Sequence, residues 1–132
     1  MNRKRFEQHL ERILRFWQRA TDTEEGGFYH FITPSGEAYG SSYKLLLIHG
    51  RLLYNYAEGM LAGLDFCADE ASDLYEYLLG NLRTPEGWYA SRRRDRFWPE
   101  GALDTYMNLF VVIGMAKYAQ ATGRADVLDE AG

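Results

Sequence analysis

The chain carries one pattern twice, about sixty positions apart, and this internal repeat limits the folds that it can adopt. The segment Glu25-Gly26-Gly27-Phe28-Tyr29 reappears as Glu86-Gly87-Trp88-Tyr89, and Tyr56-Ala57 reappears at nearly the same offset as Tyr118-Ala119. Each copy is typical of a helix, an aromatic hairpin and a second helix. Units of this kind stack side by side and need neighbours to bury both of their faces. The repeat therefore favours a layered helical array.

Apolar residues at spacings of three and four predict four helices, near residues 4–20, 42–63, 65–82 and 103–122, and the start of a fifth near 125–132. Ser41 or Ser42 is the expected N-cap of the second helix. A first hairpin is expected to turn at Thr33-Pro34-Ser35-Gly36. A second hairpin is expected after the third helix, with residues 92–96 at its tip. The alternative interpretation is a complete four-helix domain with long loops.

The chain is mildly acidic, with 19 Asp and Glu against 15 Lys and Arg and a net charge of −4 at pH 7. Binding to nucleic acid or to an anionic membrane requires an excess of cations, so we expect neither partner. Cys67 is the single cysteine, which excludes an intrachain disulfide and a zinc site built from several thiolates. We therefore expect a cytoplasmic protein with no metal and no cofactor.

A polar stripe on the expected second helix is the strongest candidate for a site. Lys44, Arg51 and Asn55 are seven and four residues apart, which places them within about 20° of one line on an ideal helix. The opposite face is apolar, so the stripe is either solvated or lines a polar cleft. In a cleft, the fixed fork of donors on Arg51 suits sugar oxygens and a developing oxyanion. His49 lies about 200° away from Arg51 around the helix, and we interpret it as a packing residue.

Other polar and aromatic residues give weaker signals. His30 on the first hairpin could overhang such a cleft, whereas His9 is expected at the surface. The basic run at residues 92–96 is either a solvated tip or a contact for an acidic group. Aromatic residues gather near this run in the sequence, Tyr106 among them, and such rings either stack on the apolar faces of sugars or pack the hairpin base.

Several motifs carry a family resemblance. Phe16-Trp17 and Glu25-Gly26-Gly27-Phe28-Tyr29 are followed by Lys44, by His49-Gly50-Arg51-Leu52-Leu53-Tyr54, and then by Asp104-Thr105-Tyr106 and Ala121-Thr122-Gly123. In this order, and over nearly the whole chain, they resemble the N-acylglucosamine 2-epimerase family, which includes cellobiose 2-epimerases and aldose–ketose isomerases. The Gly-Gly-aromatic turn alone is unspecific, whereas a Gly-Arg helix at this distance after it is more specific.

The resemblance implies an all-α fold, namely part of an (α/α)6 barrel of about 400 residues. Two helical hairpins with short β-hairpin insertions would be present here. Residues 1–132 would be the N-terminal segment of a sugar epimerase or isomerase domain, incomplete at the C-terminus. Members of the family move the proton beside the sugar carbonyl with two histidines on later inner helices, and this sequence ends before them.

The resemblance also implies roles for particular residues. Arg51 matches an arginine that holds the oxygen that becomes negative during the reaction, and Tyr106 matches a tyrosine that contacts the sugar. We expect Lys44, Asn55 and His30 to contribute to sugar binding beside them. His49 stands where many members have glutamine.

Two functions remain open at this stage. The chain is either part of an epimerase or isomerase that acts on a small-molecule sugar, or a non-catalytic sugar-binding or assembly module. In both cases the ends of an incomplete barrel would be apolar, and apolar patches usually become interfaces. We therefore expect a homo-oligomer, or a partner chain that covers the open barrel edge.

Overall fold

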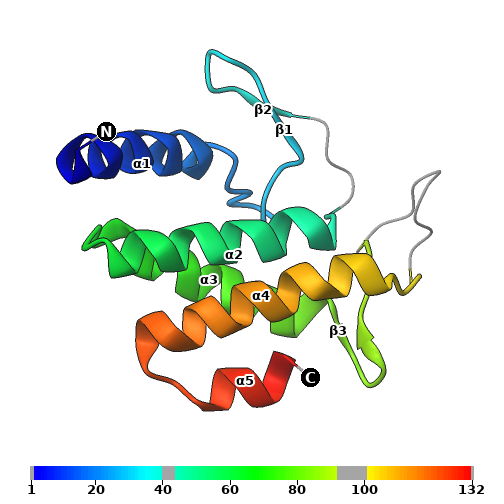
Figure 1. Cartoon of the computed structure of the whole chain (residues 1–132). Coiled ribbons are helices and arrows are strands. Elements are labelled where there is room, and N and C mark those ends of the chain that lie inside the picture. The colour runs from blue at the N-terminus through cyan, green and yellow to red at the C-terminus, as the bar shows by residue number, and fades with distance from the viewer. Residues whose placement is uncertain (1, 40–43, 92–100, 132) are drawn as a thin grey trace.

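The computed structural model describes residues 2–39, 44–91 and 101–131. Four long helices and one short one account for most of them (Figure 1). They are α1 (Arg3–Gln18), α2 (Leu46–Leu61), α3 (Phe66–Asn81), α4 (Thr105–Thr122) and α5 (Asp126–Ala131). The helices expected from the sequence are thus confirmed, with their ends shifted by a few residues.

Two short antiparallel hairpins separate the helices. In the first, β1 (Phe31–Ile32) pairs with β2 (Ala38–Tyr39), and Phe31 lies opposite Tyr39. In the second, β3 (Arg83–Thr84) pairs with β4 (Gly87–Trp88). Gly36, at the turn of the first hairpin, has a φ of 91°, a region in which glycine has no steric penalty. The two copies of the sequence repeat therefore contain the same elements in the same order.

Local chemistry sets the ends of several helices. The Asn2 side chain accepts a hydrogen bond from the Arg5 N–H at 2.9 Å and caps α1. The Asp104 carboxylate accepts from the Met107 N–H at 2.8 Å and caps α4 in the same way. Such caps satisfy backbone donors that have no partner within the helix. Gly123 ends α4 in the left-handed conformation, with a φ of 71°.

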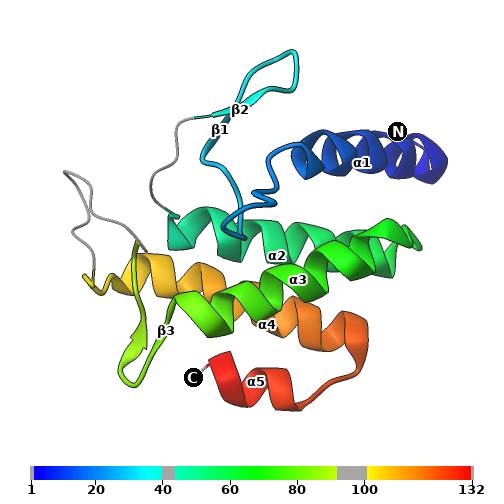
Figure 2. The ribbon, with the colours of Figure 1, turned by 180° about the vertical axis from the view of Figure 1, so that it is seen from behind.

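The helices form two layers. Both views show α2 and α4 side by side, with α3 behind them in Figure 1 and in front of them in Figure 2. α5 packs against α4, and α1 lies beside the hairpin formed by β1 and β2. The core fills the space between the layers. Among its fully buried residues are Leu53, Tyr56, Leu78 and Met115. Along the chain, α2 and α4 alternate with α1, α3 and α5, so each copy of the sequence repeat contributes one helix to each layer.

Two glycines bring α2 and α4 into close contact. A Cβ added at Gly50 would lie 2.8 Å from the carbonyl oxygen of Phe110, and one added at Gly114 would lie 2.6 Å from the carbonyl oxygen of Gly50. Only a residue without a side chain allows two helix backbones to approach so closely. This contact fixes the spacing of the two helices that carry Arg51 and Tyr106.

One boundary prediction was wrong. The N-cap of α2 is Leu45, not Ser41 or Ser42, which lie outside the described residues. Tertiary contacts delay the helix, because Leu45 bridges Ser91 and the Leu46 N–H donates to the Ala90 carbonyl at 2.9 Å. The expected arm at residues 88–91 is paired as predicted, since Tyr89 bridges Leu103 and the Ala90 N–H donates to the Ala102 carbonyl at 2.8 Å, while the expected tip at 92–96 lies outside the described residues. The hairpin of β3 and β4, which turns at residues 85–86, is an additional one that precedes this arm.

Candidate functional site

A concave surface lies where α2 meets α4. It encloses about 310 Å³ and is lined by Gly50, Arg51, Tyr54, Asn55, Phe110 and Ile113. Ligand sites are concave and mainly apolar, with a few polar groups that fix orientation. Here the aromatic and aliphatic walls come from both helices, and the polar groups are Arg51 and Asn55. The structure thus brings these two predicted residues together on one surface.

Arg51 is held in this hollow by an aromatic ring and not by a carboxylate. Its guanidinium carbon lies 4.5 Å from the centre of the Phe110 ring, a favourable cation–π geometry. Among the described residues, no ion pair or hydrogen bond of the Arg51 side chain is found. The donors of the guanidinium therefore remain available for oxygen atoms of a bound molecule.

Tyr106 lies at one end of the same surface, one turn before Phe110 on α4. The two rings make an edge-to-face contact with 5.1 Å between their centres. Tyr106 is 60% exposed, so most of the residue is accessible to a ligand. Phe110 thus links Tyr106 to Arg51, although the sequence analysis did not single it out. Its position four residues after Tyr106, on the same helix face, was the available signal.

Lys44 does not extend the stripe formed by Arg51 and Asn55. It precedes α2, is 2% exposed, and pairs with the Asp22 carboxylate at 2.5 Å. The stripe prediction failed here because the helix begins only at Leu46. Burial alone raises the pKa of Asp22, but the bond from Lys44 and two backbone N–H bonds from Glu24 and Glu25 lower it overall. The Lys44–Asp22 ion pair therefore holds the turn at residues 22–25 to the segment just before α2.

His30 lies at the base of the first hairpin, away from the hollow. Its ring packs edge-to-face on Phe31 with 4.6 Å between the centres. Phe31 in turn stacks on Tyr39 across the hairpin at 5.5 Å. His30 is therefore placed among aromatic rings of the hairpin and not among the residues that line the hollow.

His49 is a packing residue, as the sequence analysis expected. It is fully buried; its Nε2 accepts from the Phe28 N–H at 3.0 Å, and its Nδ1 lies 2.7 Å from the Leu45 carbonyl oxygen. These partners define a neutral ring with the proton on Nδ1. Burial, assisted by the charge of Lys44 and opposed by the Leu45 bond, lowers the pKa of His49 to about 4.

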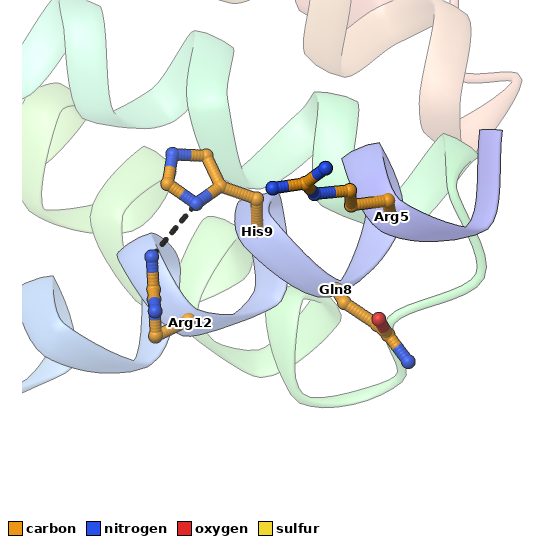
Figure 3. A pocket seen from close by; sticks show the side chains of 4 residues that line it. All are labelled: Arg5, Gln8, His9 and Arg12. Carbon is orange, nitrogen blue, oxygen red and sulfur yellow. Dashed lines mark hydrogen bonds between the residues drawn. The ribbon is translucent and has the colours of Figure 1, made fainter. Parts of the chain in front are cut away.

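Other parts of the described chain offer less specific surfaces. A hollow of about 560 Å³ on α1 is lined by Arg5, Gln8, His9 and Arg12 (Figure 3). All four side chains come from one exposed helix, so this hollow lacks the apolar walls of a small-molecule site. No group of three or more His, Cys, Asp or Glu suited to a metal ion occurs in residues 2–39, 44–91 and 101–131. None of the helices in these ranges has the length and apolar character of a membrane span.

Comparison with known proteins identifies the class. Residues 26–131 match the family described as N-acylglucosamine 2-epimerase (GlcNAc 2-epimerase), and this chain belongs to that family. Cellobiose 2-epimerase from Ruminococcus albus is 27% identical over 121 residues, which cover 89% of this chain and 31% of the relative. Cellobiose 2-epimerase from Eubacterium cellulosolvens is 25% identical over 126 residues, which cover 93% and 31%.

Solved structures show the same relationship. A sugar epimerase from a ruminal bacterium has a TM-score of 0.76 at 25% identity and covers 96% of this chain and 34% of its own. Cellobiose 2-epimerase from Spirochaeta thermophila has a TM-score of 0.74 at 25% identity, with 97% and 34% covered. A D-mannose isomerase, with a TM-score of 0.78 and 20% identity, shares the fold. The expected all-α fold, part of an (α/α)6 barrel, is confirmed. The chain spans about a third of the length of these relatives.

Proposed function

We propose that this chain supplies part of the active site of a carbohydrate 2-epimerase or aldose–ketose isomerase. Residues 1–132 would form the N-terminal segment of that enzyme's barrel domain, with a small-molecule sugar as substrate. A base removes the proton from the carbon beside the carbonyl, and the electron pair moves to the carbonyl oxygen. Return of a proton to the other face of that carbon gives the epimer, and its return to the neighbouring carbon gives the isomer. We place the protein in the cytoplasm because its one cysteine is free and buried.

The observation that carries this proposal is the guanidinium of Arg51 in the hollow between α2 and α4. It faces open space with its donors unused by carboxylates among the described residues, and Phe110 holds it from one side. An oxygen that becomes negative during the reaction gains most from a cation fixed in advance. Asn55 and Tyr106, at the edge of the same surface, would hold hydroxyl groups of the sugar.

The test is Arg51→Ala in the full-length enzyme, that is, this chain together with the rest of the barrel. Because loss of one such donor costs about 10²–10³ in rate in other enzymes, we expect kcat to fall by about 100-fold or more. Arg51→Lys keeps the charge but loses the planar fork of donors, so its kcat should lie between those of the parent and of Arg51→Ala. Arg124→Ala is the matched control, because Arg124 pairs with Asp126 on the α4–α5 connection. Unchanged kcat in Arg51→Ala would remove Arg51 from the reaction.

The exposed face of α4 favours a second function, as an assembly module. Tyr106, Leu109, Val112 and Ile113 are between 41% and 60% exposed and carry no charge. A helix that is apolar on every side is usually buried on every side. We therefore propose that a partner chain or a second copy covers this open barrel edge. Sedimentation velocity should show that Leu109→Glu with Ile113→Glu reduces self-association of the chain, and an unaltered distribution of species would contradict this.

A further inference from the structure

Two contacts between α2 and α4 share one register. The guanidinium carbon of Arg51 lies 4.5 Å from the centre of the Phe110 ring. Seven residues later on both helices, the Glu58 carboxylate pairs with the Lys117 ammonium at 2.7 Å. The equal spacing shows that the two helices run in the same direction, as Figure 1 also shows, and that the contacts lie about 10 Å apart along them.

Tyr54 lies between these two contacts. It is three residues after Arg51 and four before Glu58, the spacings at which side chains are neighbours on one helix face. Together with Ile113 of α4, it lines the hollow that also contains Arg51. The residue is half-buried, so part of it remains accessible to a molecule in the hollow. Tyr54 is therefore a wall of the candidate site that the sequence analysis did not single out.

The ion pair between Glu58 and Lys117 holds Tyr54 in place. The Lys117 ammonium lies 5.3 Å from the centre of the Tyr54 ring, within the range of a cation–π contact. The Tyr54 hydroxyl donates to the Glu58 carboxylate. The bond from Lys117 lowers the pKa of Glu58, burial opposes it, and the bond from Tyr54 assists, so that this pKa lies below its usual value. The ring and the hydroxyl of Tyr54 are thus fixed by the same pair of charges.

A fixed aromatic ring complements the polar groups of the hollow. A sugar presents hydroxyl oxygens at its rim and carbon-bound hydrogens on its faces. Arg51 and Asn55 offer donors for the oxygens, whereas the apolar surface must come from aromatic and aliphatic walls. Because Tyr54 is held in advance by Glu58 and Lys117, a ligand loses little free energy in ordering it.

We propose that Tyr54 binds the substrate by packing its ring against the apolar face of the sugar whose oxygen Arg51 holds, and that the Glu58–Lys117 pair positions Tyr54 for this contact. The inference rests on the proposed function. The carbons in contact lie away from the proton transfer, so the ring stabilises the bound sugar and the transition state equally. Tyr54 should therefore affect KM and leave kcat almost unchanged. Glu58 and Lys117 do not touch the sugar and are positioning residues.

Steady-state kinetics of the full-length enzyme test the role of Tyr54. The substrates are D-glucose, D-mannose and lactose, which present one or two sugar rings. Tyr54→Leu should raise KM by about 10-fold and leave kcat within about threefold, because an aromatic contact is lost. Tyr54→Phe keeps the ring but loses the bond to Glu58, so its KM should lie between those of the parent and of Tyr54→Leu. Tyr39→Leu is the matched control, because Tyr39 stacks on Phe31 in the first hairpin, and its KM should equal that of the parent.

A double-mutant cycle tests the positioning by the ion pair. Glu58→Gln with Lys117→Met removes both charges together, so that neither is left unpaired. We expect this pair of changes to raise KM by about threefold when Tyr54 is present and to have no further effect in Tyr54→Leu, because the ion pair acts through that ring. Circular dichroism checks that each variant retains its helices. An equal rise of KM in both backgrounds would show that the pair acts by another route and would overturn the positioning role.

Arg51→Ala, measured beside these variants, separates the inference from the proposed function. If Arg51→Ala loses kcat as expected while Tyr54→Leu keeps the KM of the parent, the proposed function stands and the role of Tyr54 is overturned. If the parent turns over none of the three sugars, the proposed function fails, and isothermal titration calorimetry with the same sugars gives Kd in place of KM. A Kd raised about 10-fold by Tyr54→Leu would then still support the contact. An unchanged Kd, or a parent that binds none of the sugars, would overturn it.

Discussion

Replacing Gly50 by alanine tests how the site is built. The added Cβ would lie 2.8 Å from the carbonyl carbon and oxygen of Phe110 and 2.9 Å from the Val111 nitrogen. Ordinary contact begins at about 3.4 Å, so α2 and α4 would have to separate by about 0.6 Å, and Gly114→Ala would require about 0.8 Å. The atoms in the way belong to the backbone, which cannot rotate away as a side chain can.

The expected cost follows from overpacking. Forcing apart two well-packed elements costs about 1–3 kcal/mol, and alanine returns less than about 1 kcal/mol through its higher helix propensity. We expect Gly50→Ala and Gly114→Ala each to lower the free energy of unfolding by about 2 kcal/mol. Gly80→Ala on α3 is the matched control, because no atom lies within 4 Å of its added Cβ. That variant should be unchanged or more stable by about 0.5 kcal/mol.

Urea unfolding followed by circular dichroism at 222 nm measures all three variants under identical conditions. If Gly50→Ala were as stable as Gly80→Ala, the close approach of α2 and α4 would be wrong.

Three further predictions concern the turn at residues 22–27 and the two residues that hold it, Lys44 and His49. Because the pKa of His49 is about 4 in the folded state and about 6.5 when unfolded, the unfolded chain binds more protons between these values. Stability should therefore fall as the pH is lowered from 6.5 to 4, by up to about 3 kcal/mol, and His49→Gln should flatten that part of the urea-midpoint profile; an equally steep profile would contradict a neutral buried ring. Gly27→Ala should cost at least about 2 kcal/mol, because Gly27 has a φ of 71° and its Cβ would lie 2.7 Å from His49 Nε2; a melting temperature equal to that of the parent would refute this. Lys44→Met should cost about 3 kcal/mol by leaving the Asp22 charge buried and unpaired, and adding Asp22→Asn should recover part of the loss; two losses that simply add would show that the residues are not coupled.

The periodic part of the fold could be predicted from the sequence. The apolar spacing located α1, α3 and α4, and Gly123 correctly marked the end of α4, because these features depend on neighbours within one helix. The start of α2 could not be predicted this way. Leu45 and Leu46 are held by bonds to Ser91 and Ala90 about forty-five positions later, and no local pattern encodes that contact.

The same distinction between local patterns and tertiary contacts applies to the candidate site. Arg51 and Asn55 share a helix face, and helical spacing was sufficient to pair them. Lys44 was grouped with them only on the assumption that the helix already included it. Phe110 was missed because its role depends on the glycine contact that brings α4 beside Arg51, a relation between two helices that is visible only in three dimensions.

The hydrogen bond between His49 and the Phe28 N–H has a consequence for Arg51. A helix can in principle rotate about its own axis, and such rotation would swing the guanidinium out of the hollow. His49 lies on the opposite side of α2 from Arg51. Its ring accepts the hydrogen bond from Phe28, just before β1, and stacks on Tyr77 of α3. The rotation of α2 about its axis is therefore fixed by contacts on its buried face. Residues that do not touch a ligand thus determine the direction of the Arg51 guanidinium.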